Sequence, residues 1–272
     1  MIKILAIDLD GTLYTTGRTV SARSRQALAK ALASGLQPVI VTGRSRRGAE
    51  IALDTLEMDL PYICSAGALL RSGLDGETLH AWSFHAHQEM LHIIDFTRKH
   101  NIGLIAEPRD SNPYWFGPDS MNEIMDPLTV KEAFKSVRSF QPELDFDLPL
   151  LKATITATPE LLAEAEKLIR LNCPSIHQVY SGIQYIDLTA DGVNKGSALQ
   201  ALSTHLGLQP TEVAAIGDQD IDLQMLNFAG LPIAMQNGVP ALKQIATWVA
   251  PSNDEDGVAW AIDEILKHNL QI

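Results

Sequence analysis

Continuous apolar runs alternate with segments of mixed polarity at the start of the chain. The apolar runs, which are typical of strands buried on both faces, lie at residues 3–9, 36–41 and 62–65. Residues 22–34 and 45–56 between them are predicted as helices. Ser21 is placed to cap the first helix and Gly35 to end it. This order predicts a parallel sheet with helices on its faces.

The pattern changes after the third strand. Residues 67–84 predict a β-hairpin that turns at residues 72–76. Strands and helices then mix without the earlier regularity, and a stretch rich in Pro and aromatic residues interrupts them. The expected elements are helices at residues 88–100, 130–140 and 159–171, a strand at 151–157, and two short strands within 176–187 that turn at Ser181–Gly182. We therefore predict a separate α+β domain over residues 85–187.

The first pattern returns in the last third of the chain. Helices are expected at residues 195–206, 220–228, 239–246 and 258–268, and strands at 213–216, 231–235 and 248–250. We predict that residues 1–84 and 188–272 together form one α/β domain, into which the α+β domain is inserted. Hinges between the two domains are expected near residues 82–85 and 187–192.

The charge balance excludes two classes of partner. The chain has 272 residues, with 33 Asp and Glu against 21 Lys and Arg, for a net charge of −12. A nucleic-acid binder that follows the phosphate backbone needs a basic surface, and so does docking on an anionic membrane. The excess of acid is either a solvated surface or includes carboxylates gathered around a metal.

The cysteines and the apolar runs indicate the compartment. Cys64 and Cys173 are the only two cysteines, without disulfide or zinc spacing, so we expect two buried free thiols. The N-terminal apolar run is short and is interrupted by Asp8, unlike a signal peptide. No stretch approaches the ~18 apolar residues of a membrane span. We expect a cytoplasmic protein, as a monomer or a small homo-oligomer.

Two carboxylates stand where the first strand ends. Asp8 and Asp10 are separated by one residue and followed by Gly11, which allows a sharp turn and close approach to a ligand. Ligand sites of open parallel sheets lie beyond the carboxyl ends of the strands. Two acids at this spacing repel one another, and a divalent cation with a preference for oxygen ligands, such as Mg²⁺, would relieve the repulsion.

Three more polar groups follow strands or precede a helix. Thr42 and Gly43 follow the second strand, Lys195 begins the first helix after the insertion, and Asp218 and Asp222 follow a later strand. Each feature alone is common in proteins. Acid, hydroxyl, cation and acid in this chain order rarely arise together by chance.

These motifs resemble those of the haloacid-dehalogenase superfamily of phosphohydrolases. Within the superfamily, the sequence is most similar to the Cof-type subfamily. In that subfamily a large α/β cap lies between the second motif, here at Thr42, and the third motif, here at Lys195. Residues 63–68, 234–238 and 253–258 support it, so the resemblance covers the whole chain. It implies a Rossmann-like parallel sheet core with helices on both faces and an inserted α+β cap domain.

The resemblance also implies roles for the catalytic residues. Asp8 would attack phosphorus and become an aspartyl phosphate, and Asp10 would protonate the leaving oxygen and then activate water. Thr42 and Lys195 would hold the phosphoryl oxygens. Gly43, at the same strand end, is assigned to substrate binding.

The same resemblance supplies a metal site and further contacts to substrate. Mg²⁺ would be bound by Asp8, the backbone carbonyl of Asp10, Asp218 and, directly or through one water, Asp222. Arg44 is interpreted either as a substrate contact or as an ion-paired residue at a helix start. Asn237 matches polar residues near the family's active site and is assigned to substrate binding or to support of the metal loop.

Two positions depart from the family pattern. Ala66 and Ile221 stand where the subfamily usually has Asn. We predict a Mg²⁺-dependent phosphatase that acts on small phosphorylated metabolites such as sugar phosphates. Two alternatives stay open: phosphoryl transfer as in phosphosugar mutases, and a catalytically weakened protein that binds a phosphorylated metabolite. A dehalogenase is disfavoured, because that branch lacks an acid at the position of Asp10.

Overall fold

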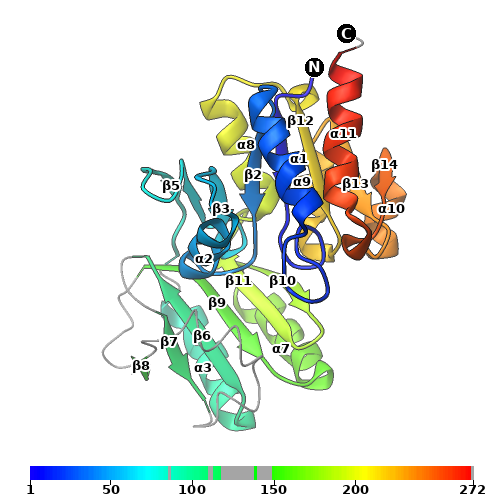
Figure 1. The fold of residues 1–272 in the computed structure, drawn as a ribbon. Helices are drawn as coiled ribbons and strands as arrows, with labels where there is room; N and C mark the ends of the chain where they lie inside the picture. Colours follow the sequence, from blue (N-terminus) through cyan, green and yellow to red (C-terminus); the bar gives the residue numbers. More distant parts are fainter. Residues whose placement is uncertain (85–86, 110–112, 118–137, 140–148, 271–272) are drawn as a thin grey trace.

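The computed structural model describes residues 1–84, 87–109, 113–117, 138–139 and 149–270. Within them the chain forms two β-sheets, each with its own helices, which lie one above the other in Figure 1. Both cysteines are buried free thiols, as predicted. None of the helices in this described part of the chain is long and apolar enough to cross a membrane.

The larger sheet has eight strands in the order β14-β13-β12-β1-β2-β3-β4-β5. Its parallel strands are β1 (Ile4–Ile7), β2 (Gln37–Val41), β3 (Tyr62–Cys64), β12 (Val213–Gly217), β13 (Leu231–Met235) and β14 (Trp248–Ala250). The hairpin of β4 (Leu69–Arg71) and β5 (Thr78–Ala81) extends one edge in antiparallel fashion. Ile4 of β1 is in register with Gln37 and with Val213, so the first strand lies between the two halves of the chain.

Helices cover both faces of this sheet because its central strands are apolar on both sides. The helices are α1 (Ala22–Ala33), α2 (Arg46–Leu56), α8 (Lys195–His205), α9 (Leu223–Phe228), α10 (Pro240–Ile245) and α11 (Gly257–Asn269). Leu5 and Ile7 of β1 pack in one cluster with residues of α1, α2 and α11. Ile4 and Ala6, which point the opposite way, pack in another with residues of α8, α9 and α10. We call this unit the core.

The smaller sheet has the order β10-β11-β9-β6-β7-β8. Its strands are β6 (Gly103–Pro108), β7 (Tyr114–Phe116), β8 (Arg138–Ser139), β9 (Leu150–Thr156), β10 (Ile176–Gly182) and β11 (Tyr185–Ala190). All neighbouring pairs are antiparallel except β7 with β8. Two helices, α3 (His87–His100) and α7 (Pro159–Asn172), pack on one face through apolar residues. We call the sheet with these helices the cap.

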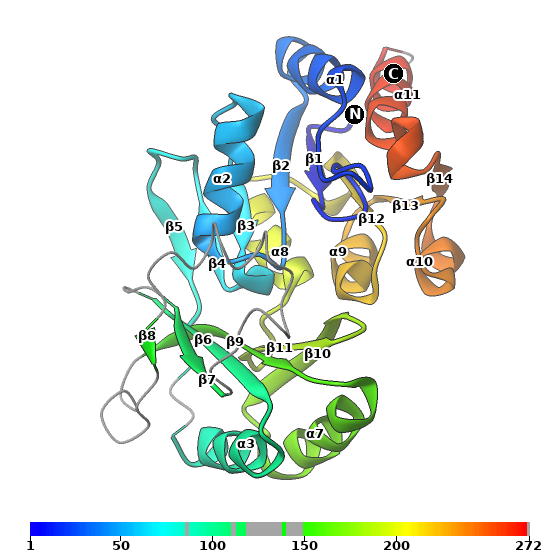
Figure 2. The ribbon, with the colours of Figure 1, turned by 60° about the horizontal axis from the view of Figure 1, so that its bottom comes forward.

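The other face of the cap sheet is turned toward the core (Figure 2). It carries polar side chains that alternate with the apolar residues of the helix-covered face, and these polar residues are buried: Glu107, Lys152, Thr154, Asp187 and Thr189. The carboxyl ends of the core strands therefore face a polar surface of the cap.

The fold class predicted from the sequence is confirmed, and several elements differ in detail. Strands β6 and β7 lie in the Pro- and aromatic-rich stretch, where no strand was predicted. The helix predicted at residues 130–140 falls outside the described residues, except that residues 138–139 form β8. Strands β10 and β11 are longer than expected, with Gly182 paired to Tyr185, so the predicted turn at Ser181–Gly182 is wrong by two residues. The bounds of the insertion stay predictions, and β11 continues past residue 187 to Ala190.

Candidate active site

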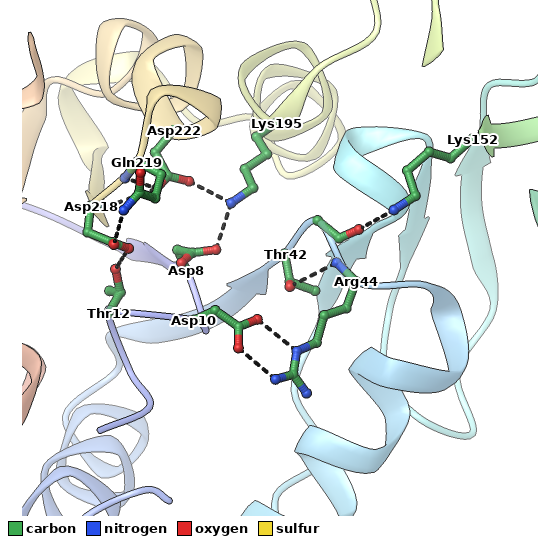
Figure 3. Close-up of polar contacts among 11 residues, drawn as sticks. Asp8, Asp10, Thr12, Thr42, Arg44, Lys152, Lys195, Asp218, Gln219 and Asp222 are labelled. Atoms are coloured by element: carbon green, nitrogen blue, oxygen red, sulfur yellow. Dashed lines mark hydrogen bonds and ion pairs between the residues drawn. The ribbon is translucent and has the colours of Figure 1, made fainter. Parts of the chain in front are cut away.

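Three parallel strands bring the predicted motifs to one edge of the core sheet. Asp8 follows β1, Thr42 follows β2 and Asp218 follows β12, and these strands are neighbours in the sheet. Because their carboxyl ends meet at one edge, residues far apart in the chain converge there, on the side of the cap (Figure 3). The predicted convergence of acid, hydroxyl and cation is therefore present.

Lys195 connects two of the carboxylates. Its Nζ donates to Asp8 Oδ1 at 2.6 Å and to Asp222 Oδ1 at 2.6 Å. Lys195 is only 1% exposed and Asp222 is fully buried. Charge-assisted hydrogen bonds of this length are strong, and they fix the ammonium beside Asp8.

The first turn of α8 places this lysine. Asn194 is the N-cap, and its Oδ1 accepts from the backbone N–H groups of Gly196 and Ser197, each at 2.9 Å. A short 3₁₀ turn, η1 (Ser65–Gly67), packs against this helix start, and a Cβ on Gly67 would lie 2.3 Å from the Asn194 carbonyl oxygen. Lys195 thus begins a helix whose first turn is fixed by a cap and by a close backbone contact.

The loop after β12 organises the acids. Asp222 Oδ2 accepts from the backbone N–H groups of Asp218 and Gln219, at 3.0 and 3.1 Å. Asp218 Oδ1 accepts from Thr12 Oγ1 at 2.8 Å, which ties this loop to the loop after β1. Neither Thr12 nor Gln219 was predicted from the sequence, because a single hydroxyl or amide beside a motif carries no distinctive signal.

Burial and mutual repulsion shift the pKa values of the acids away from their usual range. Burial raises the pKa of Asp8, Lys195 lowers it, and Asp222 and Asp218 raise it again, so that the pKa of Asp8 lies well above its usual range. Burial and then Asp222 raise the pKa of Asp218 to about 6. Burial alone would lower the pKa of Lys195, but Asp222 and Asp8 outweigh it and raise that pKa. The site thus holds more negative charge than one lysine offsets.

Three of the carboxylates form a group suited to a divalent cation. One oxygen from each of Asp8, Asp218 and Asp222 can be chosen so that all lie within 4.8 Å of one another. Hard carboxylate ligands that are buried and repel one another fit Mg²⁺. The Asp10 side chain is not in this group, and the contribution of the Asp10 backbone carbonyl stays a prediction.

Asp10 instead pairs with Arg44. The guanidinium donates from Nε to Asp10 Oδ2 at 2.7 Å and from Nη2 to Oδ1 at 2.6 Å, while it stacks over the ring of Tyr14 at 5.0 Å. The Asp10 side chain is 53% exposed and the Arg44 side chain 25% exposed. Arg44 is therefore ion-paired, as one of its two interpretations predicts. Its interpretation as a substrate contact stays a prediction.

Thr42 is buried, and its Oγ1 accepts from the Arg44 backbone N–H at 3.1 Å. Asn237 lies on the other side of the loop after β1, where its Nδ2 donates to the Gly11 carbonyl at 2.8 Å and its Oδ1 accepts from Asn253 N at 3.1 Å. The structure therefore gives Asn237 a contact that supports the loop; its assignment to substrate binding stays a prediction.

The two departures from the family pattern have defined surroundings. Ser65 and Ala66 both adopt left-handed backbone angles, with φ of 50° and 56°. Such angles cost about 1 kcal/mol or more for a residue other than Gly. Ile221 is 8% exposed, and its Cδ1 would lie 3.5 Å from a Cβ on Gly43, as would Oδ2 of the cap residue Asp187. Ile221 and Asp187 of the cap thus both lie beside Gly43.

Comparison with known proteins identifies relatives over the whole chain. The sequence model of the haloacid dehalogenase-like hydrolase family matches residues 5–262. The chain is 29% identical over 295 residues to the 5-amino-6-(5-phospho-D-ribitylamino)uracil phosphatase YwtE of Bacillus subtilis, covering 97% of this chain and 98% of that protein.

Solved structures agree. A haloacid dehalogenase-like hydrolase from Bacteroides thetaiotaomicron superposes with a TM-score of 0.83 at 25% identity, over 97% of this chain and 100% of the other. A subclass IIB sugar phosphatase superposes with a TM-score of 0.80 at 23% identity, over 97% of this chain and 98% of the other, a level that speaks for the fold alone.

Proposed function

Because this chain belongs to the haloacid dehalogenase-like hydrolases and is a phosphatase, we propose that it hydrolyses small phosphorylated metabolites through an aspartyl phosphate on Asp8, with Mg²⁺ as its cofactor. Sugar phosphates are the proposed substrate class, because the cap surface above the site is polar and hydrogen-bonding. The observation that carries the proposal is the convergence of Asp8, Lys195, Asp218 and Asp222 at one sheet edge.

Asp8 is proposed as the nucleophile. One carboxylate oxygen forms a bond to phosphorus while the bond from phosphorus to the leaving oxygen breaks, and Asp10 gives that oxygen its proton. In the second half, Asp10 takes a proton from water, the water oxygen attacks phosphorus, and the bond to Asp8 breaks. The exposed carboxylate of Asp10 is open to a leaving group, and Arg44 holds it beside the site.

Lys195 and Thr42 are proposed to bind the phosphoryl oxygens. The ammonium of Lys195 is fixed 2.6 Å from Asp8 Oδ1, so a phosphoryl group attached to Asp8 comes within its reach. The Thr42 oxygen already accepts a hydrogen bond from Arg44 N, which leaves its own proton available to donate. Both groups would be in place before the substrate binds.

The proposed metal ligands are Asp8, the Asp10 carbonyl, Asp218 and Asp222. A bound Mg²⁺ would neutralise charge on the carboxylates and on the substrate phosphate, which otherwise repel. Asp222 already accepts hydrogen bonds from Lys195 and from two backbone N–H groups, so it is also placed to orient the Asp218 loop.

A phosphate-release assay on a panel of phosphomonoesters tests the proposal. The wild-type protein with Mg²⁺ is expected to release phosphate from at least one sugar phosphate. Asp8→Asn should lower kcat by more than about 10³-fold, because the amide is a poor nucleophile. Asp54→Asn, at an exposed position of α2, is the matched control and should leave activity unchanged.

Two outcomes would overturn the proposal. One is release of no phosphate from the panel by the wild type. The other is equal activity of wild type and Asp8→Asn. Recovery of an isomerised sugar phosphate in place of free phosphate would identify a mutase.

A further inference from the structure

Three charged residues of the cap are buried where the cap meets the core. Glu107 of β6, Lys152 of β9 and Asp187 of β11 are 5%, 6% and 2% exposed. Lys152 Nζ lies 3.3 Å from Glu107 Oε1 and 3.4 Å from Asp187 Oδ1. Thr154 also donates to Asp187 Oδ1 at 2.6 Å. Burial alone would lower the pKa of Lys152, but Asp187 and Glu107 outweigh it and raise that pKa, so the lysine is charged.

The shortest contact of Lys152 reaches into the core. Its Nζ donates to the backbone carbonyl of Gly43 at 2.7 Å, closer than either carboxylate of the cap (Figure 3). Glu107 makes a second contact of this kind, because its Oε2 accepts from Ser65 Oγ at 2.8 Å. The buried charges of the cap therefore bind the two loops that follow β2 and β3.

The Gly43 carbonyl belongs to the same peptide group as the Arg44 N–H. A peptide group is planar, so a hydrogen bond that fixes the direction of its carbonyl also fixes the direction of its N–H. That N–H donates to Thr42 Oγ1 at 3.1 Å. An unbroken chain of contacts thus runs from the Lys152 ammonium, through one peptide plane, to the Thr42 hydroxyl.

Burial of a charged cluster of this kind is not explained by stability. Removing charges from water costs more than their mutual attraction commonly returns, and apolar residues of the same volume often serve stability as well or better. Lys152 is the one charged residue of β9, at a position whose side chain faces the core. A positively charged side chain at this position can donate a hydrogen bond to the Gly43 carbonyl oxygen, which an apolar side chain cannot do.

We propose that Lys152 is a positioning residue for the phosphatase reaction, which acts through the Gly43–Arg44 peptide to orient the Thr42 hydroxyl toward the phosphoryl group. The inference rests on the proposed role of Thr42 in the site. Lys152 then links the cap to the second motif, so that the hydroxyl is correctly directed when the cap stands over the core.

Lys152→Met tests this with two substrates, p-nitrophenyl phosphate and the best sugar phosphate of the panel. A misdirected hydroxyl affects the phosphoryl group that both substrates share, so kcat should fall by about 10²-fold on each, with a much smaller change in KM. Lys167→Met, on the exposed side of α7 in the same cap, is the matched control and should behave as wild type. A loss confined to the sugar phosphate would overturn the proposal, because it would make Lys152 a contact to the leaving group.

A double-mutant cycle separates positioning from a general structural role. Thr42→Val removes the hydroxyl with little change of shape. If Lys152 acts through that hydroxyl, adding Lys152→Met to Thr42→Val should lower kcat less than twofold further. If the fold-losses in kcat of the two single variants multiply in the double variant, the proposal is overturned. The proposed function would still stand in that case, because the wild type remains active.

Loss of the lysine leaves two carboxylates without their cation, and a variant that fails to fold would be uninformative on its own. The pair Glu107→Gln with Lys152→Met removes one of these charges, and thermal denaturation identifies the folded variant. The same cycle with Thr42→Val is then measured on that pair. Additive losses in the folded pair contradict the proposal, and non-additive losses support it.

Discussion

Asp218 and Asp222 of the site differ in the hydrogen-bond donors that their carboxylates receive. Asp222 receives one ammonium and two backbone N–H groups, whereas Asp218 receives one hydroxyl and one amide. Asp218 accordingly has a pKa raised to about 6, through burial and the nearby Asp222. At the proposed metal site, a proton and Mg²⁺ would therefore compete for Asp218 near pH 6.

This competition predicts the pH dependence of Mg²⁺ binding. Mg²⁺ would bind the deprotonated carboxylate, so protonation of Asp218 alone should raise the Kd for Mg²⁺ about tenfold for each pH unit below pH 6. The raised pKa of Asp8 adds to this slope. Isothermal titration at pH 5, 6 and 7, in two buffers of different ionisation enthalpy, measures both Kd and the protons released. Equal affinities at pH 5 and pH 7 would contradict the prediction.

The atoms around Gly11 leave no room for a side chain at this position. Its φ is +82°, and a Cβ there would lie 2.3 Å from Asp218 Oδ2. Gly11→Ala is therefore expected to displace Asp218, a proposed metal ligand, and to lower kcat by about 10²-fold or more, besides its cost in backbone strain.

Gly35→Ala is the matched control for Gly11→Ala. Gly35 has a φ of +78°, and no atom lies within 4 Å of the position its Cβ would take. The control should lose about 1 kcal/mol of unfolding free energy from strain and keep its kcat. Denaturant titration and steady-state kinetics on both variants measure the two effects. Equal kinetics in the two variants would show that the contact with Asp218 is unimportant.

At the scale of the element, the first turn of α8 carries Lys195, a proposed catalytic residue. Asn194→Ala removes the N-cap and should cost about 1 kcal/mol of unfolding free energy. Because the frayed turn is the one that presents Lys195, kcat should also fall, by about tenfold. Ser21→Ala removes the N-cap of α1, away from the site, and should cost similar stability with kcat kept. Loss of activity in both variants would refute a local effect.

The elements of the core were largely predictable from sequence, whereas those of the cap were less so. Strand β1 is a continuous apolar run that ends at Asp8, so pattern and motif agree there. Strand β6 contains Glu107 and ends in Pro108, and the charge and the proline conceal a strand whose polar side chain is satisfied by distant residues. The role of Lys152 was missed for the same reason, because its partners come from other strands and from the core.

The sequence pattern also did not predict local backbone angles. Ser65 was predicted as the end of a strand, yet it has a φ of 50° and starts the η1 turn. A serine gives no sign of a left-handed angle, which here is maintained by tertiary contacts, including the hydrogen bond to Glu107. By contrast Asp8, Thr42 and Asp218 were predicted as site residues from strand ends and Lys195 from a helix start. The topology of a parallel sheet determines where such strand ends meet.

At the scale of the whole molecule, core and cap have largely separate hydrophobic clusters, which touch at Leu151 of β9 and Ala190 of β11. Several polar contacts also join the two units. Mg²⁺ at the proposed ligands would bind the folded core only. Calorimetry should therefore show two transitions, of which Mg²⁺ at about 100 times its Kd raises one, with about 2.7 kcal/mol of added stability. A single transition that shifts as a whole would show that the two units unfold together.

The position of β1 in the sheet has a consequence for synthesis of the chain. Ile4 lies beside Val213, so the strand that precedes Asp8 cannot gain its second neighbour until more than two hundred later residues have left the ribosome. The strands of the cap, by contrast, are contiguous between Gly103 and Ala190 and emerge earlier. During translation the described strands of the cap emerge before the core sheet can close, and Asp8 gains its contact with Lys195 only after they have been made. On the proposed mechanism, the growing chain would therefore lack phosphatase activity at least until residue 222 has been made.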